Sequence, residues 1–318
     1  MTTAVVPETS TGTLPETNVV ANRGVWHTVR YWLGNWKLTI GLILIIGLTA
    51  FSIIGSFLVD FDRTRVASGP FNAAPSAEYL FGTDNVGRDI WALMIHGKGR
   101  DIWALMIHGI YPSLKVGLIA GVIGTAVGVV LGITAGYYGG TVDAVVSTTA
   151  DIFLTIPSLL ILIVLASYVR TTTIEFTALV IAIFAWAGPT RLMRSQTLSL
   201  RERAFIPLAK LSGQGDFEIA IRQILPNLLP YIMAGFVGAV SGAILALVGI
   251  QILGLGPLFT PNLGMILQAA YQGAAIFRGM WWWWLPPTVA LMIIFISLFL
   301  ISIALDELAN PRLRERAK

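Results

Sequence analysis

The sequence predicts an all-α membrane protein that crosses the bilayer six times and has both termini in the cytoplasm. The first observation is composition: of 318 residues, 55% are hydrophobic and 12% are charged, and the mean hydropathy is +0.76. Soluble domains carry about 25% charged residues, so this chain is too apolar to be one. The other two observations are six long apolar runs and an uneven distribution of lysine and arginine between the loops that join them.

The six apolar runs are each long enough to cross a membrane. A hydrocarbon core of about 30 Å needs roughly 20 apolar residues in a helix. The expected spans are 38–59, 116–138, 146–169, 174–193, 228–253 and 280–305. Pro157 and Pro189 predict kinks in the third and fourth spans, because proline lacks an amide donor. Asp151 is expected at the cytoplasmic interface, because a carboxylate is costly in hydrocarbon.

The positive-inside rule orients these spans. The N-terminal tail, the 191–222 loop and the C-terminal tail hold 13 of the 21 lysines and arginines, whereas the opposite loops hold seven. Both termini and the 191–222 loop are therefore expected in the cytoplasm. The net charge of +4 follows from this topology, so nucleic-acid binding is not expected.

The same pattern divides the chain into five parts. Residues 1–36 are expected to form a disordered cytoplasmic tail, because they are polar and lack the apolar core of a signal peptide, and 37–60 are expected to hold the first span. An external loop with a tandem repeat occupies 61–111. Residues 112–306 form a five-helix core that includes the polar loop 195–227, and 307–318 form a basic cytoplasmic tail.

Several kinds of chemistry are excluded. The chain has no cysteine, so disulfides, thiolate metal sites and a cysteine nucleophile are absent. HExxH, GxSxG and the phosphate-binding pattern GxxxxGK[ST] do not occur, and no histidine lies in an expected span. The spans also lack the series of acids that a proton-driven pump needs. We expect no catalytic residue, no metal site and no cofactor bound by this chain.

The second span carries glycines at four-residue spacing. Gly124, Gly128, Gly132 and Gly136 share one helix face, with Gly140 continuing the series and Gly117 and Gly121 preceding it. Such a face lets another helix backbone approach closely. The face either packs against another helix of this subunit, or it lines the translocation path or faces a partner subunit.

The 201–227 segment is the longest polar interruption between apolar runs. Five apolar residues predict an amphipathic helix of two to three turns: Phe205, Ile206, Leu208, Ala209 and Leu211. Gly213 and Gly215 then break the helix, and Asp216 is a candidate N-cap for a second helix that runs to Pro226. Pattern alone fits either docking into a groove on a soluble partner or lying in the lipid interface.

This layout resembles the coupling segment by which permease subunits of ATP-binding-cassette importers contact their ATPases. In that family a Glu-Ala-Ala triplet is followed by three residues, a glycine, nine residues and an ending with Leu-Pro. The matching positions here are Pro207, Leu208 and Ala209, then Gly213, then Ile224, Leu225, Pro226 and Asn227. Pro207 replaces the usual acid, and proline suits a helix start, so the helix is expected to begin there.

The resemblance implies which residues would mediate coupling. The usual acid is missing, so coupling is expected to depend more on the turn at Gly213, the basic flank of Arg201 and Arg203, and insertion of Phe205 into the partner than on a glutamate contact. The full set of expected coupling residues is Arg201, Glu202, Arg203, Phe205, Pro207, Leu208, Ala209, Gly213, Asp216, Pro226 and Asn227.

Other landmarks resemble the C-type permease of dipeptide and oligopeptide importers. FGTDNVGRDIWALMIHG, YYGGTVD, ADIFLTIPSLLILIVL, RQILPNLLP and LDELANPRLR follow in that family's order over about 35–318. The resemblance implies a cytoplasmic coupling helix and a heterodimer with a B-type permease. It also implies two ATPase subunits that use ATP and Mg²⁺, an external or periplasmic solute-binding protein, and a multi-pass location in the inner membrane of a bacterium or archaeon.

One feature departs from that pattern. GRDIWALMIHG occurs at both 87–97 and 99–109, separated by Lys98, whereas the family has one copy. Twelve residues rotate a helix by about 120°, so the two copies cannot present the same face to one neighbour. One copy is expected to lead into the second span and the other to form an external loop or helix extension; a sequence-assembly error would give the same repeat. His96 and His108 are copies of one residue without acidic neighbours and predict no metal site.

The transported solute is less clearly indicated. Trp281–Trp284 begin the sixth span, where indoles prefer the headgroup region. Aromatic rings also stack on sugars, so an oligosaccharide is the alternative to the peptide that the resemblance implies. A channel or a membrane-embedded enzyme is disfavoured, because a channel needs no coupling segment and an enzyme needs a nucleophile with a base.

Overall fold

The computed structural model describes residues 34–59, 69–70, 72–78, 80, 83, 98–99, 102–168, 173–257 and 260–309. Within these residues the chain is helical except for turns and one antiparallel pair of two-residue strands, β1 (Gly69–Pro70) and β2 (Lys98–Gly99). The first copy of the repeat at 87–97 and both predicted tails, apart from a few residues next to the spans, lie outside the described residues.

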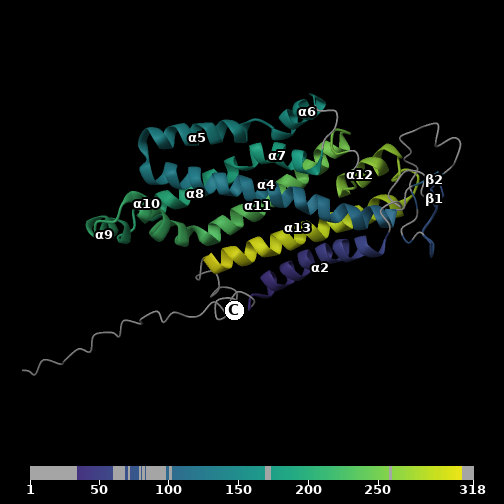
Figure 1. Cartoon of the computed structure of the whole chain (residues 1–318), viewed down its shortest axis with the longest axis horizontal. Coiled ribbons are helices and arrows are strands. Elements are labelled where there is room, and N and C mark those ends of the chain that lie inside the picture. The colour runs from purple at the N-terminus through teal and green to yellow at the C-terminus, as the bar shows by residue number, and fades with distance from the viewer. Residues whose placement is uncertain are drawn as a thin grey trace, which may run out of the picture.

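Long helices lie side by side along the molecule (Figure 1). Five stretches are long and apolar enough to cross a membrane: α2 (Trp36–Leu58), α4 (Ile102–Tyr138), α7 (Ile174–Ala185) with α8 (Ala187–Arg201), α10 to α11 (Asp216–Ile252), and α13 (Trp281–Ala309). A sixth is the bent pair α5 (Gly140–Thr155) and α6 (Ser158–Tyr168). The predicted all-α fold with six spans is confirmed if this pair counts as one.

The third predicted span is therefore broken. α5 and α6 meet at an angle of 75°, and Pro157 lies in the break between them. Pro189, where a second kink was expected, lies in the first turn of α8, just after the single-residue interruption at Trp186, and α7 and α8 together form one span. Proline is tolerated there because the first turn of a helix has no intrahelical use for its amide.

Side-chain caps begin three of the helices. Asn35 Oδ1 accepts hydrogen bonds from the amides of Lys37 at 3.0 Å and Leu38 at 3.4 Å at the start of α2. Thr173 caps α7, and Asn262 caps the ten-residue helix α12 (Leu263–Gln272). These caps satisfy amides that would otherwise have no partner at the helix start.

α4 begins well before the expected position. The prediction placed 61–111 in an external loop and started the span at 116, but the helix starts at Ile102. Residues 102–109 of the second repeat copy form its first turns, and Ile102, Ala104 and Leu105 are each 0% exposed. His108 Nε2 lies 2.9 Å from the carbonyl oxygen of Val59, at the end of α2. The second copy thus leads into the span, as one of the two copies was expected to do.

The glycine face of α4 packs against α7 and α8 of the same chain. A β-carbon added at Gly128 would lie 2.5 Å from Pro189 Cβ, and one added at Gly132 would lie 2.5 Å from Met193 Cβ. Gly124 and Gly136 meet Ala185 and Thr197 in the same way. The face is therefore used for packing within the subunit and is closed to solute.

Gly140 does not belong to that face. α4 ends at Tyr138, and Gly139 and Gly140 have φ angles of +68° and +55° in the turn to α5. Glycine reaches this left-handed region without the steric cost that a side chain brings. The four-residue spacing continues past the helix end by coincidence.

The segment between the fifth and sixth expected spans contains a further helix, α12. α12 packs against α4, α11 and α13, and Leu263 and Ile266 on it are fully buried. Gln251 of α11 and Gln268 of α12 are buried as well, with their side chains 3.3 Å apart in a hydrogen bond. Paired buried amides hold α12 against the end of α11.

Candidate functional site

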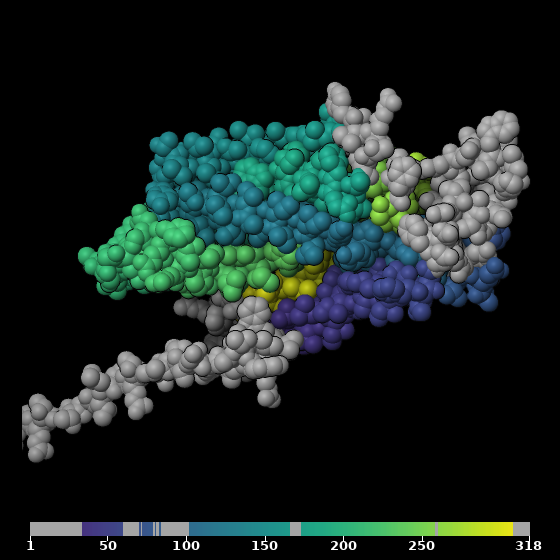
Figure 2. Space-filling model, viewed as in Figure 1, coloured from purple at the N-terminus to yellow at the C-terminus, as the bar shows by residue number. Residues whose placement is uncertain are grey.

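The 201–227 segment lies at one end of the helix bundle. It consists of α9 (Phe205–Leu211), a turn, α10 (Asp216–Ile219) and a five-residue π-helix η2 (Ala220–Ile224) that leads directly into α11 (Leu225–Ile252). α9 and α10 lie at the end opposite α12 and the two strands (Figure 1). In Figure 2 the same segment, in green, is the outermost part of the described chain on the left.

The helix boundaries correct two expectations. α9 begins at Phe205, two residues before Pro207, but Pro207 still lies in the first turn, where its missing amide costs no hydrogen bond. The second helix does not end at Pro226, because that proline lies in the first turn of α11 and the chain continues to Ile252 without a break. The π-helix immediately before Pro226 provides the local rearrangement that accommodates it.

The turn between α9 and α10 depends on Gly213. Its φ is +80°, in the left-handed region, and its amide donates to the carbonyl of Lys210 at 3.0 Å. Gln214 N then donates to the carbonyl of Ala209 at 3.1 Å. These bonds end α9 in the way a left-handed glycine commonly ends a helix, so the sequence correctly located the turn.

Apolar side chains occupy both sides of this segment. Ile206, Ala209 and Ile219 are buried against Ile133 of α4 and Met193 of α8. On the outer side, Leu208 is 61% exposed, Leu211 85% and Phe217 79%. One face therefore anchors the segment to the helix bundle, and the other presents bulky apolar groups that nothing in the described chain covers.

Phe205 lies on the anchored side. It is half-buried and packs against the cluster around Met193 and Ile206. The outward apolar residues are Leu208, Leu211 and Phe217, and only Leu208 is among the expected coupling residues. Phe217 could have been recognised as a bulky apolar residue directly after the glycine turn.

Tyr137 at the end of α4 connects both halves of the segment. Its hydroxyl donates a hydrogen bond of 2.6 Å to Asp216 Oδ1 on α10. Lys210 on α9 lies with its ammonium 5.2 Å from the centre of the Tyr137 ring and 3.8 Å from the Asp216 carboxylate. Asp216 is therefore no N-cap: Gly215 occupies the cap position without a side-chain bond, and the carboxylate binds Tyr137 instead.

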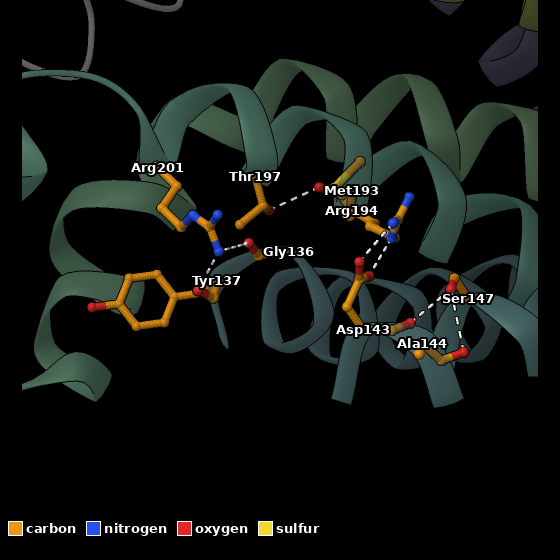
Figure 3. A network of polar contacts seen from close by, with 9 residues as sticks. All are labelled: Gly136, Tyr137, Asp143, Ala144, Ser147, Met193, Arg194, Thr197 and Arg201. Atoms are coloured by element: carbon orange, nitrogen blue, oxygen red, sulfur yellow. Dashed lines mark hydrogen bonds and ion pairs between the residues drawn. The ribbon is translucent and has the colours of Figure 1, made fainter. Parts of the chain in front are cut away.

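Two arginines of α8, Arg201 and Arg194, lie near the joint formed by Tyr137, Asp216 and Lys210, and they bind α4 and α5. Figure 3 shows Arg201 directing its guanidinium to the backbone of α4, where Nη1 donates to the carbonyl of Tyr137 at 3.2 Å. Arg194 binds the Asp143 carboxylate of α5 through Nε and Nη2, the latter at 2.6 Å. Arg201 thus neutralises the negative end of the α4 dipole, besides flanking the 201–227 segment.

The remaining predicted residues make local contacts. Glu202 is 76% exposed at its side chain and accepts from Arg201 Nε at 3.4 Å, and Arg203 is exposed. Asn227 Nδ2 donates to the carbonyl of Gln223 at 2.6 Å. Asp151 is exposed on α5 and lies 3.9 Å from Arg191. None of these exposed contacts is expected to stabilise the fold by more than about 1 kcal/mol.

A cavity of about 450 Å³ lies beside α11, on the side of α5 to α8. Its α11 wall consists of small residues: Ala234, Gly235, Gly238, Ala239, Gly242, Ala243 and Ala246. A β-carbon added at Gly238 or Gly242 would meet no atom within 4 Å, unlike one added to the glycines of α4. The open small-residue wall is therefore on α11, and the four-residue spacing of Gly238 and Gly242 was a signal for it in the sequence.

The tryptophan run packs largely inside the molecule. Trp283 is 0% exposed, and Trp282 and Trp284 are partly buried against the cluster that joins α2, α12 and α13. Trp281 is 52% exposed. Trp283 is thus unavailable for stacking on a solute, and the four rings do not form one exposed surface. Among the described residues, no three histidine, aspartate or glutamate side chains lie close enough together to hold a metal ion.

Comparison with known proteins points to one family. The family described as binding-protein-dependent transport system inner membrane component matches residues 128–315. The oligopeptide transport system permease protein OppC of Lactococcus lactis subsp. cremoris is 32% identical over 236 residues, which are 74% of this chain and 76% of that protein. The dipeptide transport system permease protein DppC of Haemophilus influenzae is 30% identical over 76% of this chain and 79% of its own length.

The fold also matches a solved transporter. An inward-facing structure of the MetNI methionine ABC transporter superposes with a TM-score of 0.51 and 18% identity, over 64% of this chain and 94% of the matched chain. A second crystal form gives a TM-score of 0.50 over 65% and 95% of the two chains. At this identity the match concerns the arrangement of the helices.

Proposed function

This chain belongs to the family of binding-protein-dependent transport inner membrane components, and from that premise we propose that it is the permease subunit of an ATP-driven importer of peptides. As a member of the family it is a multi-pass inner-membrane protein and a non-catalytic subunit of an ABC importer. The peptide substrate is supported by the similarity to OppC and DppC, whose names state oligopeptide and dipeptide transport.

The observation that carries the proposal is the outward face of the 201–227 segment. Leu208, Leu211 and Phe217 form an exposed apolar surface on a short helical element that is fastened to α4 and α8. A soluble ATPase with an apolar groove could bind this surface and move the helix bundle through the fastened side. The proposal accordingly assigns the segment, and with it both termini, to the cytoplasmic side of the membrane.

The α11 cavity supports a path shared with a second permease. Its wall of glycine and alanine leaves backbone and space exposed, and the cavity is mainly apolar. A homologous B-type permease facing this wall would enclose a passage between the two subunits. We propose that a solute delivered by an external binding protein crosses there as two ATPases, using ATP and Mg²⁺, open and close the passage.

An oligosaccharide importer has less support. The argument for sugar was the tryptophan run, but Trp283 is fully buried and its neighbours are partly buried. The rings stabilise the start of α13 and offer no continuous stacking surface.

Cysteine crosslinking tests the docking surface, because the native chain contains no cysteine. Leu211→Cys and Phe217→Cys are expected to crosslink to the ATPases in the assembled transporter. Phe277→Cys is the matched control, since Phe277 is 94% exposed in the turn after α12, at the other end of the molecule. Equal crosslinking from all three positions, or none from the first two, would contradict the proposal.

Two functional assays complete the test. The chain alone is expected to hydrolyse no ATP, and appreciable turnover would overturn the permease assignment. Uptake of a labelled peptide in proteoliposomes should be reduced by unlabelled peptides and unaffected by oligosaccharides.

Gly213→Val should uncouple ATP hydrolysis from uptake, because valine cannot adopt φ of +80° without strain. Normal uptake by this variant would count against the role of the turn.

A further inference from the structure

A second cavity lies on the other side of α11, away from the proposed solute path. It has a volume of about 340 Å³ and is lined by residues of four helices, α2, α4, α11 and α13. Six of its lining residues are Leu42, Ile45, Leu114, Leu118, Val237 and Ile301. Almost all the exposed lining is apolar, so an aliphatic chain would lose little by leaving the bilayer to fill it.

Charged side chains of opposite sign lie next to this cavity. Lys115 of α4 is one of its lining residues, and its Nζ contacts Glu175 Oε1 of α7 at 2.5 Å. Their side chains remain 35% and 57% exposed, so both can accept a further partner. Tyr111, one turn before Lys115, also lines the cavity and is 46% exposed.

The depth of this pair fits a lipid headgroup. Lys115 and Tyr137 are 22 residues apart in one helix, which corresponds to about 33 Å along its axis. The hydrocarbon core of a bilayer is about 30 Å thick. Glu175 lies in the first turn of α7, at the start of the span Ile174–Arg201, so the Lys115–Glu175 pair lies near the end of that span, with the apolar cavity beside it.

We propose that this cavity binds a zwitterionic aminophospholipid such as phosphatidylethanolamine. The phosphate would accept hydrogen bonds from Lys115 and Tyr111, the primary ammonium would donate to Glu175, and one acyl chain would fill the cavity. An anionic lipid would place net negative charge beside Glu175. A trimethylammonium headgroup could not donate a hydrogen bond to the carboxylate, so phosphatidylcholine is disfavoured as well.

Native mass spectrometry of the full-length protein tests the proposal. Protein released from micelles that hold equal amounts of phosphatidylethanolamine, phosphatidylcholine and phosphatidylglycerol is expected to retain the first preferentially. Lys115→Gln should abolish that retention. Glu175→Gln should reduce the preference for phosphatidylethanolamine over phosphatidylglycerol by about tenfold, because a charge-assisted hydrogen bond is lost while Lys115 remains.

Controls separate lipid binding from a loss of folding. Lys210→Gln removes an exposed lysine at the other edge of the bundle and should leave retention unchanged. Leu118→Phe adds bulk at a position that is 53% exposed, so it should fill the cavity and reduce retention without unfolding the protein. Equal retention of all three lipids, retention unaffected by Lys115→Gln or Leu118→Phe, or displacement of the lipid by a dipeptide would overturn the proposal.

Discussion

Replacing Tyr137 by phenylalanine should loosen the 201–227 segment while leaving the helix bundle intact. The substitution removes only the hydroxyl that donates to Asp216 at 2.6 Å. Tyr137 is 6% exposed and packed in the cluster around Met193, so the ring is expected to stay in place. Lys210 keeps both its position over the ring and its contact with Asp216.

The expected magnitude follows from the surroundings of the hydrogen bond. Hydrogen bonds to charged groups contribute about 1.5–3 kcal/mol. The Asp216 side chain is 50% exposed, so water can replace the lost donor and the cost should fall below that range, to about 1 kcal/mol. That corresponds to roughly a fivefold shift between docked and undocked forms of the segment.

Pulsed electron paramagnetic resonance can measure this shift in the cysteine-free chain. Spin labels at Val130→Cys on α4 and Leu211→Cys on α9 occupy exposed positions, 64% and 85% respectively. Tyr137→Phe should broaden the distance distribution between them or add a second population. In the assembled transporter, solute imported per ATP hydrolysed should fall by up to about fivefold.

Tyr138→Phe is the matched control, because the neighbouring tyrosine is 58% exposed and its hydroxyl plays no part in this joint. It should change neither the distance distribution nor transport. An unchanged distance distribution in Tyr137→Phe would refute the assignment of Tyr137 as the joint, whatever its effect on uptake.

Three further predictions concern stability. Gly132→Leu should destabilise the protein by about 3 kcal/mol or more and lower its thermal unfolding midpoint, because the new β-carbon would lie 2.5 Å from Met193 Cβ. Gly238→Leu should leave the midpoint nearly unchanged, because a β-carbon there meets no atom within 4 Å. Equal effects of the two substitutions would contradict the account of glycine packing on α4. Deleting 87–98 should leave α4 and transport intact, since the buried copy at 99–109 remains, and a protein that no longer folds or transports would show that the first copy is required. Asp143→Asn should destabilise the protein by about 1–2 kcal/mol, because it breaks the two-point contact between Asp143, 19% exposed, and Arg194, 30% exposed. The control Glu202→Gln should change the stability by no more than about 0.5 kcal/mol. Similar unfolding midpoints for the two variants would argue against the α5–α8 ion pair.

The sequence by itself determined the features that depend on local chemistry. The length and apolarity of the runs predicted the membrane spans, because the thickness of the bilayer sets the required helix length. Gly213 marked the turn after α9 correctly, because a left-handed backbone favours glycine at that position whatever surrounds it. Pro157 marked the break between α5 and α6 for a similarly local reason.

Only the tertiary structure decided what these elements contact. Spacing could not distinguish the packed glycines of α4 from the open ones of α11, because both patterns favour close approach and only the neighbouring helix reveals which face is covered. Asp216 looked like a helix cap, yet its partner Tyr137 is 79 positions away in the sequence. Such contacts form only when helices distant in sequence pack together, so the local sequence around either residue does not predict its partner.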